Sequence, residues 1–597
     1  MPPPPCWRGA SSTPLPDLYP IHLLRKLRWT RLGAALLSGL ALSCAFAPLE
    51  WWWMAWLAFL PLLVLPTPQS RWERLGVGMI FGYSHFATAL HWLNTVGFGA
   101  GWLLAVYCAL YPAVWYYLYS AVLWSLKPRE SLSEEQSEAE LAAAHRAGAA
   151  LWHLPRYRVA LGVAALAAAI WTALEWVSSW LFTGFPWNQL GISQVETIFA
   201  IPAWDFGIFF ISFLILFTNG LLILAVAFLL HSSRRYIPLL VSLAWIALWV
   251  AMLFPLADGA APSHSERLKG TTLRILAIQG DVPECRDWNE QIFDMAWNRY
   301  ADLTREAFRA CVEPPPDLIL WPEGALPAPI TYAPYATRLR KLLQELKTPI
   351  LLGALDIRPQ PGESPEEAPV FNTAFLLDAD SPILVNPYAD RGEYYDKIHR
   401  VPFGEYVPFG KYFPWLVDAI GMGRDLTPGQ NYKLFEIKGV KIGVNICFED
   451  AFPEISRRFA QDGADLLVTI TNDCWYRQSS GARQHRNHAV FRAIETHRSL
   501  LRSGNNSDTC FISKRGWIRD PICGPDGSAF GPGWHLYELN DTHFATTSRV
   551  SGNLFAHLCA LATLLTLVWL QWKSLWHHAR MVQIRTSKPT TDRKSSQ

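Results

Sequence analysis

Long apolar stretches recur along this sequence, and they restrict its fold more than any other feature. A helix that crosses a bilayer needs about 20 mostly apolar residues, because each residue adds about 1.5 Å to its length. Seven such stretches precede residue 257 and an eighth lies near the end of the chain. We predict membrane-spanning helices near residues 32–49, 51–65, 75–93, 102–124, 159–181, 206–230, 237–256 and 554–570.

Lysine and arginine alternate among the loops between these stretches. They gather before the first stretch, between the second and third, between the fourth and fifth, between the sixth and seventh, and after the eighth. The loops after the first, third and fifth stretches contain none. Because cytoplasmic loops are enriched in these residues, the pattern predicts that both termini are cytoplasmic. The long segment between the seventh and eighth stretches is then predicted to lie outside the cytoplasm.

The segment from about residue 273 to about residue 544 has a different character, with short strands alternating with amphipathic helices. This pattern is typical of an α/β domain. Strands are predicted at 273–279, 317–321, 349–355 and 371–377, helices at 290–310 and 335–346, and a βαβ unit at 441–447, 452–461 and 465–471. We predict a cytoplasmic N-terminal segment at 1–31, a seven-span membrane domain at 32–256 with a cytoplasmic linker at 125–158, an extracytoplasmic domain at 257–552, the eighth span at 553–572 and a basic cytoplasmic tail at 573–597.

Composition excludes several classes of function. The formal net charge is only +2 and the basic residues cluster at the ends of apolar runs, so we expect no nucleic-acid partner. Ten cysteines show no paired CxxC spacing, so we expect no metal centre and no dense disulfide scaffold. Cys510 and Cys523 flank a predicted turn; two buried free thiols are favoured there, and a bridge stays open. His485 and His488 lack a third ligand nearby, which favours structural or solvated histidines.

Three predicted strand ends carry reactive side chains, and functional groups in open α/β sheets gather where strands end. In KIGVNICFEDAFPE a strand stops at Cys447 and a helix follows, a turn that can expose a nucleophilic thiolate. In LILWPEGALP, Glu323 follows a buried strand inside a rigid turn that suits a general base. In YYDKIHRVPFGEYVPFG, Lys397 could stabilise an oxyanion by its charge. Each residue alone is better explained as an ordinary buried thiol, turn carboxylate or surface lysine. Only the combination of the three indicates a catalytic site.

The order Glu, Lys, Cys in WPE, DK and NICFE contexts resembles the nitrilase superfamily. With seven predicted spans before that domain and one after it, the chain more narrowly resembles the apolipoprotein N-acyltransferase family. The likeness covers nearly the whole chain and includes LFTGFPWNQLGISQ, IQGDVP and TNDCWY. It implies a multi-span α-helical membrane bundle joined to a nitrilase-like four-layer α-β-β-α sandwich.

The resemblance also implies residue roles. Cys447 would be the nucleophile, Glu323 the general base and Lys397 the oxyanion stabiliser. It implies supporting roles for Glu405, Glu449 and Phe448, and substrate-binding or loop roles for Trp288, Trp475 and Pro408. Phe448 stands where this family usually has tyrosine.

The activity implied by the resemblance is transfer of a fatty acyl chain from a membrane glycerophospholipid, through a Cys447 thioester, to an apolipoprotein. The acceptor would be the α-amino group of its S-diacylglyceryl cysteine, with no cofactor or metal. We expect a monomer in the bacterial inner membrane, multi-pass, with its catalytic domain facing the periplasm. Two alternatives stay open: a membrane-tethered nitrilase-type amidase, and a non-catalytic lipid-binding protein of the same fold.

Overall fold

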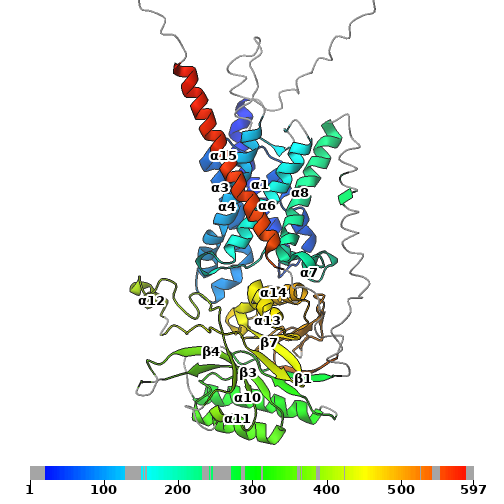
Figure 1. Cartoon of the computed structure of the whole chain (residues 1–597), viewed down its shortest axis with the longest axis vertical. Coiled ribbons are helices and arrows are strands. Elements are labelled where there is room, and N and C mark those ends of the chain that lie inside the picture. The colour runs from blue at the N-terminus through cyan, green and yellow to red at the C-terminus, as the bar shows by residue number, and fades with distance from the viewer. Residues whose placement is uncertain are drawn as a thin grey trace, which may run out of the picture.

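The computed structural model describes most of the chain. It covers residues 21–127, 149–151, 154, 157–231, 241, 244–245, 271–283, 290–310, 313–359, 363–364, 366–384, 390–421, 424–524, 526–540 and 552–586. Long helices form a bundle at one end of the molecule and an α/β domain lies at the other (Figure 1). After that domain the chain returns to the bundle as α15 (Leu554–Thr586), which packs against α6 (Tyr157–Ser178).

Four of the described helices are long and apolar enough to cross a membrane. Their apolar ranges are Ala100–Leu126 in α4 (Ala100–Leu126), Tyr157–Ser178 in α6, Ile208–Ala227 in α8 (Ile208–His231) and Leu554–Trp576 in α15. These correspond to the predicted fourth, fifth, sixth and eighth spans. Helices α1 (Ile21–Ser43) and α3 (Arg71–Ala89) lie at the predicted first and third spans and pack against each other.

The predicted second span, residues 51–65, does not form one helix. A 3-10 turn, η1 (Trp52–Trp56), is followed by the short helix α2 (Leu60–Leu63), which has Pro61 in its first turn. Proline lacks the N–H that a helix interior needs and collides with the preceding turn, so a continuous helix through it is disfavoured. A single spanning helix was therefore the wrong prediction here. Most of the predicted seventh span and most of the 125–158 linker lie outside the described residues.

The α/β domain contains two six-stranded sheets, with the orders β12-β1-β2-β3-β4-β5 and β11-β10-β9-β8-β7-β6. Strands β1, β2 and β3 run parallel in the first sheet, and β7, β8 and β9 run parallel in the second. The first sheet consists of β1 (Leu273–Gln279), β2 (Leu318–Leu320), β3 (Ile350–Ile357), β4 (Val370–Leu377), β5 (Glu393–Asp396) and β12 (Gly533–Leu539). The second consists of β6 (Leu434–Ile437), β7 (Val440–Ile446), β8 (Leu466–Thr471), β9 (Leu500–Gly504), β10 (Cys510–Ile512) and β11 (Ile518–Arg519).

The two sheets pack face to face. Successive side chains of a strand point to opposite faces, so one strand contributes to the core between the sheets and to the core beneath the helices. In β1, Ile275 belongs to the apolar cluster that includes Val444 and Val468 of the second sheet. Its neighbour Leu276 belongs to a separate cluster with residues of two helices, such as Tyr300. Strands buried on both faces are nearly all apolar, as the LRILAIQ run of β1 is.

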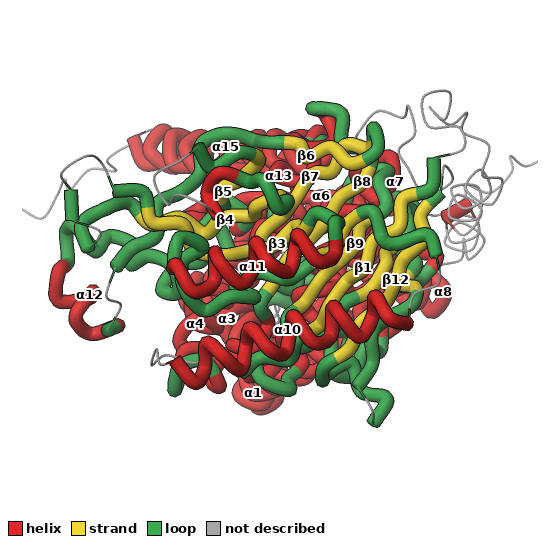
Figure 2. Tube along the Cα trace, turned by 90° about the horizontal axis from the view of Figure 1, so that it is seen from below, coloured by secondary structure: helices red, strands yellow, loops and turns green. Residues whose placement is uncertain are grey.

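Helices complete the four layers. Helices α10 (Glu290–Ala310) and α11 (Ala333–Leu346) cross the outer face of the first sheet (Figure 2). Helices α13 (Pro453–Gln461) and α14 (Ser480–Thr496) lie between the second sheet and the bundle (Figure 1). The predicted α-β-β-α order is confirmed, and β1 and α10 have the predicted bounds. The layering places one helical layer of the domain directly against the membrane bundle.

Cys510 and Cys523, for which free thiols were predicted, lie near the edge of the second sheet, and both are free. Cys510 begins β10 and is buried, whereas Cys523 is exposed. The predicted turn between β10 and β11 is present, because the two strands pair antiparallel. The prediction that both thiols are buried was therefore wrong for Cys523, which lies in an exposed loop beyond β11.

Candidate active site

Cys447 lies at a sharp turn between a buried strand and a helix. Strand β7 ends one residue earlier, and Cys447 begins a 3-10 turn, η8 (Cys447–Ala451), that leads into α13. The Cys447 backbone has φ of 52°, a left-handed conformation that is strained for a residue with a side chain. Its side chain is 7% exposed. This is the predicted strand–turn–helix arrangement.

Glu323 and Lys397 reach the same place from the ends of two strands in the first sheet. Glu323 follows β2, and Lys397 directly follows β5. Nζ of Lys397 lies 3.4 Å from Oε1 of Glu323. The Cys447 thiol interacts electrostatically with both groups. The three residues predicted to react are therefore brought together by three different strand ends.

The carboxylate of Glu405 and the amide of Asn372 complete the polar cluster. Lys397 Nζ donates to Oε1 of Glu405 at 2.8 Å. Asn372 Nδ2, on β4, donates to Oε1 of Glu323 at 2.7 Å and to Oε1 of Glu405 at 3.0 Å. Oε2 of Glu323 accepts from the backbone N–H of Asn472 at 2.9 Å. The donors thus hold Glu323 in one orientation.

Sequence reasoning missed Asn372. A polar residue inside the apolar strand VFNTAFLL was the available signal, since a buried amide needs partners. That signal alone does not identify the partners, which come from residues 49 and 33 positions away in the chain.

Glu449 joins the Cys447 turn to the segment after Lys397. Its Oε1 accepts from the backbone N–H groups of Ile398 at 2.7 Å and His399 at 3.1 Å. Its Oε2 accepts from Ile446 N–H at 2.8 Å, and the Tyr395 hydroxyl donates at 3.0 Å to Oε1. Burial raises the pKa of Glu449 to about 7, against the effect of these hydrogen bonds. The side chain therefore fixes the spacing between the cysteine and lysine segments.

The local charges set the resting protonation of the thiol and the amine. Burial alone would lower the pKa of Lys397, but the carboxylates of Glu405 and Glu323 outweigh it and raise that pKa well above the usual value. Burial and the charge of Glu323 raise the pKa of Cys447 well above its usual value, and Lys397 opposes them. The resting site therefore holds an ammonium and a neutral thiol. A base must take the thiol proton as the sulfur reacts.

Beneath the Cys447 turn lies a buried network of charged residues. Arg502 donates to Oδ2 of Asp450 at 2.9 Å and to Oδ2 of Asp473 at 2.6 Å. His485 contacts Oδ1 of Asp473 through Nδ1 at 2.8 Å, and its Nε2 lies 3.2 Å from the carbonyl oxygen of Cys447. All four network side chains are buried. His485 is thus a structural histidine, as favoured from the sequence, and it supports the backbone of Cys447.

The remaining predicted residues differ in position. Phe448 is buried, with its ring centroid 6.0 Å from that of Trp187 in the bundle. Trp475 is exposed, in the turn η9 (Asp473–Tyr476). Pro408 is half-buried in the loop after Lys397. Trp288 lies outside the described residues.

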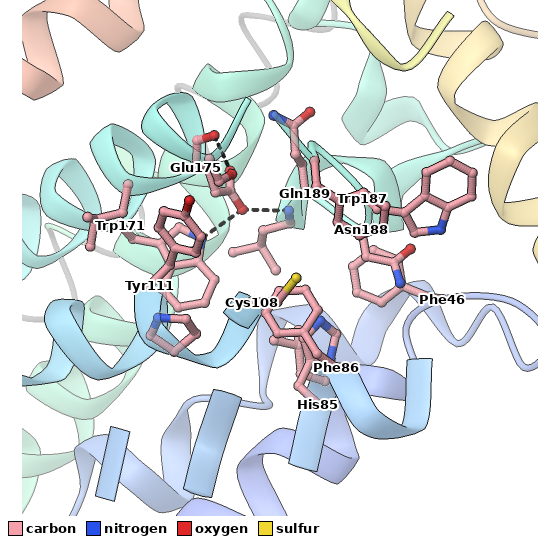
Figure 3. A pocket seen from close by; sticks show the side chains of 16 residues that line it. Phe46, His85, Phe86, Cys108, Tyr111, Trp171, Glu175, Trp187, Asn188 and Gln189 are labelled. Atoms are coloured by element: carbon pink, nitrogen blue, oxygen red, sulfur yellow. Dashed lines mark hydrogen bonds between the residues drawn. The ribbon is translucent and has the colours of Figure 1, made fainter. Parts of the chain in front are cut away.

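A cavity in the bundle adjoins Phe448. It has a volume of about 40 Å³ and is mostly apolar (Figure 3). Trp187 lines it and also contacts Phe448. Glu175 projects into it and accepts hydrogen bonds from Trp171 Nε1 at 2.8 Å and Leu190 N–H at 2.7 Å, so this acidic residue of a membrane helix has the polar partners it needs. The wall comprises Leu42, Phe46, His85, Phe86, Cys108, Tyr111, Pro112, Trp171, Leu174, Glu175, Ser178, Phe185, Trp187, Asn188, Gln189 and Leu190.

Comparison with known proteins agrees with both halves of this architecture. Residues 38–221 match the apolipoprotein N-acyltransferase N-terminal domain, and residues 291–550 match the carbon-nitrogen hydrolase family. An apolipoprotein N-acyltransferase of Geobacter metallireducens is 31% identical over 500 residues, which cover 81% of this chain and 85% of the relative. This chain belongs to the apolipoprotein N-acyltransferase family. The predicted family is confirmed, and membership makes the chain an acyltransferase.

Other similar proteins include the apolipoprotein N-acyltransferase of Shewanella oneidensis, which is 27% identical over 83% of this chain and 88% of its own length. That of Vibrio parahaemolyticus is 26% identical over 90% of this chain and 96% of its own length. Among solved structures, the nitrilase-superfamily protein Nit3 of Saccharomyces cerevisiae aligns with 47% of this chain and 93% of its own, with TM-score 0.32 and 16% identity. The membrane helices and the apolipoprotein N-acyltransferase relatives together indicate a bacterial membrane protein.

Proposed function

We propose that this acyltransferase moves a fatty acyl chain from a glycerophospholipid to the α-amino group of an S-diacylglyceryl cysteine on an apolipoprotein, through a thioester on Cys447. The observation that carries the proposal is the meeting of Cys447, Glu323 and Lys397 beside an apolar bundle. A thiol, a carboxylate and a buried ammonium suit acyl transfer, and the bundle supplies the lipid environment.

In the first step Glu323 takes the proton of the Cys447 thiol while the sulfur attacks the carbonyl carbon of a phospholipid ester. The negative charge that develops on the carbonyl oxygen is stabilised by Lys397 and by the backbone N–H of Phe448. The ester C–O bond then breaks, and the lysophospholipid oxygen takes the proton from Glu323. The raised pKa of Cys447 supports this order, because the resting thiol is neutral and loses its proton only with help from a base.

In the second step the amine attacks the thioester carbonyl. Glu323 takes a proton from the amine, the C–S bond breaks, and the thiol of Cys447 is restored with that proton. Dividing the transfer into two steps allows one site to act on a lipid donor and a lipidated acceptor in turn, with ping-pong kinetics. Glu405 and Asn372 act as positioning groups, because they hold Lys397 and Glu323 in place.

Lipid access is supported by the loop that follows Lys397. Apolar side chains of this loop, and of the helix α12 (Pro414–Ile420) that continues it, are exposed at Phe403, Phe409, Tyr412, Phe413, Trp415 and Ile420. An exposed aromatic group of this size is typical of a surface that meets lipid or a partner. We propose that this segment, which includes Pro408, contacts the lipid substrates as they enter. We propose the same role for the exposed Trp475.

The proposed location is the inner membrane, with the chain crossing it several times and the domain at 257–552 facing the periplasm. The alternation of lysine and arginine among the loops supports this orientation. Phosphatase and cytoplasmic reporters fused after residue 256 test it. An active phosphatase is expected, and an active cytoplasmic reporter there would reverse the orientation.

The decisive experiment is mass spectrometry of the protein after incubation with labelled phosphatidylethanolamine and no acceptor. We expect an acyl adduct on Cys447 that neutral hydroxylamine removes and that a diacylglyceryl peptide discharges faster than water does. Cys523→Ala, which removes an exposed free thiol, is the matched control and should keep the adduct. An equal adduct on Cys447→Ala would refute the covalent route. Faster discharge by water than by the peptide would favour a membrane-tethered amidase.

A further inference from the structure

The contact between the membrane bundle and the α/β domain is centred on the amide of Gln484. This residue lies on α14 and is 1% exposed. Its Oε1 accepts hydrogen bonds from Trp92 Nε1 at 2.9 Å and from Trp187 Nε1 at 2.8 Å. Its Nε2 donates to the carbonyl oxygens of Ala47 and Ala89, each at 2.9 Å. An amide has two donors and two acceptor sites, so one side chain of the α/β domain is fully satisfied by bundle residues.

These four bundle partners come from separate parts of the chain, and a fifth contact of 3.5 Å is made by Nδ2 of Asn188. Ala47 follows α1, Ala89 ends α3, Trp92 lies in the turn η2 (His91–Thr95), and Trp187 lies in the loop between α6 and α8. The hydrogen bonds of Gln484 can therefore all form only when these segments are correctly assembled. Since buried amides are costly to leave unpaired, its position is strongly determined by the bundle.

The residue after Gln484 reaches the nucleophile. His485 lies 3.2 Å from the carbonyl oxygen of Cys447 through Nε2, and 2.8 Å from Asp473 through Nδ1. The Cys447 backbone is held at φ of 52°, where a residue with a side chain needs support from its surroundings. A shift of α14 along the bundle would move His485 and so alter the support of this turn.

A second route leads from the same amide to the same turn. Trp187, which donates to Gln484, has its ring centroid 6.0 Å from the ring of Phe448 in a stacked arrangement. Phe448 directly follows Cys447 and is predicted to supply a backbone N–H to the oxyanion. The bundle therefore contacts the nucleophile turn through Trp187 and Phe448, and also through Gln484 and His485.

We infer that Gln484 is a positioning residue through which the membrane bundle sets the geometry of the Cys447 turn. The bundle is then part of the catalytic apparatus in addition to its role as an anchor. This inference rests on the proposed role of Cys447 as the nucleophile.

The test compares two buried glutamines in the full-length protein. Gln484→Met keeps the size of the side chain and removes all its hydrogen bonds. Gln194→Met is the matched control, because Gln194 is also buried and accepts from a tryptophan, Trp56, at 3.0 Å, but lies within the bundle. Single-turnover acylation is measured with phosphatidylethanolamine, together with the pH profile of Cys447 alkylation by iodoacetamide in the folded protein.

Gln484→Met is expected to slow acylation about 100-fold, the cost of a misplacement of about 1 Å, while KM for the phospholipid stays within about threefold. It should also shift the pH profile of Cys447 alkylation. Gln194→Met should lower the melting temperature and leave both the rate and the profile of the folded protein unchanged. A wild-type rate and profile in Gln484→Met, or an equal loss in Gln194→Met, would overturn the inference.

Trp187→Phe keeps the test decisive should Gln484→Met fail to fold. It removes one hydrogen bond to Gln484 and retains a ring against Phe448, and we expect about tenfold slower acylation with a shifted alkylation profile. An unchanged rate and profile in Trp187→Phe would reject the inference. Failure of the proposed function is distinguishable, because it would appear as no Cys447 adduct in the wild-type protein, whereas alkylation requires no lipid substrate.

Discussion

Nζ of Lys397 donates a hydrogen bond of 2.8 Å to Oε1 of Glu405, and Lys397 is only 1% exposed. The carboxylate of Glu323 lies 3.4 Å from the same ammonium. Burial by itself would lower the pKa of Lys397, but these two carboxylates outweigh it and raise the pKa. A fixed positive charge is therefore present beside the thiol before an oxyanion develops, and no reorganisation is needed during the reaction.

We predict that Lys397→Met slows single-turnover acylation by about 10²- to 10³-fold, because the lost charge acts mainly on the developing oxyanion. Lys397→Arg should restore little, since a guanidinium has a different shape from an ammonium. Lys433→Met is the control, because Lys433 forms an exposed ion pair with Glu393. A near-normal acylation rate in Lys397→Met would remove this residue from the proposed mechanism.

Asn372 provides a second prediction. Its amide donates to both Glu323 and Glu405, so Asn372→Leu should leave two carboxylates less firmly held and slow acylation about 10- to 100-fold. Thr373→Val is the control, because the hydroxyl of this neighbouring residue donates to Asp396 and to neither Glu323 nor Glu405. Equal rates for the two variants would show that the amide has no positioning role.

Much of the architecture could be predicted because it depends on local patterns. Strand β1 and helix α10 were predicted at their observed bounds, since an apolar run of seven residues and an amphipathic repeat are readable from neighbouring residues. The meeting of Glu323, Lys397 and Cys447 also followed from their positions at strand ends, together with the family resemblance.

The rest could not be predicted because it depends on residues far apart in the chain. The amide of Gln484 is bound by residues 392 and 297 positions away, and its own sequence context, RQHRN, gives no sign of burial in a bundle. The 51–65 segment failed for a different reason. Its apolar composition suits a span, but the stretch is short and interrupted by Pro61, and it forms a 3-10 turn and a short helix in place of one long helix.

The buried arginine of the charge network gives a prediction for stability. Arg502 is completely buried and bonds Asp450 and Asp473. Arg502→Leu removes the ion pairs of this guanidinium with two buried carboxylates and leaves His485 as their remaining cationic partner, so we expect a loss of about 3 to 5 kcal/mol in the free energy of unfolding. The control is Arg305→Leu, whose exposed pair with Glu345 should contribute about 0 to 1 kcal/mol. Chemical denaturation in detergent measures both, and equal losses would contradict the prediction.

The last prediction concerns pH, through His485. Burial alone would lower the pKa of this residue, but Asp450 and Asp473 outweigh burial and the opposing charge of Arg502 and raise the pKa to about 9. Asp473 shows the matching effect, because Arg502 and His485 outweigh burial and lower its pKa to about 2. The folded protein therefore holds a charged imidazole between two carboxylates at neutral pH.

A histidine whose pKa is raised by folding stabilises the protein fully below its unfolded pKa of about 6.5, and this contribution is lost as the pH rises through about 9. We therefore expect the melting temperature of the wild-type protein to fall between pH 6.5 and 9, in the absence of lipid substrate. His485→Gln keeps a polar side chain but has no proton to lose, so it should be less stable at pH 6.5 and show a flatter profile over the same range. His535→Gln, on β12 in the first sheet, is the control and should retain the wild-type slope. If His485→Gln and the wild-type protein lose stability in parallel from pH 6.5 to 9, His485 does not carry the charge that the network assigns to it.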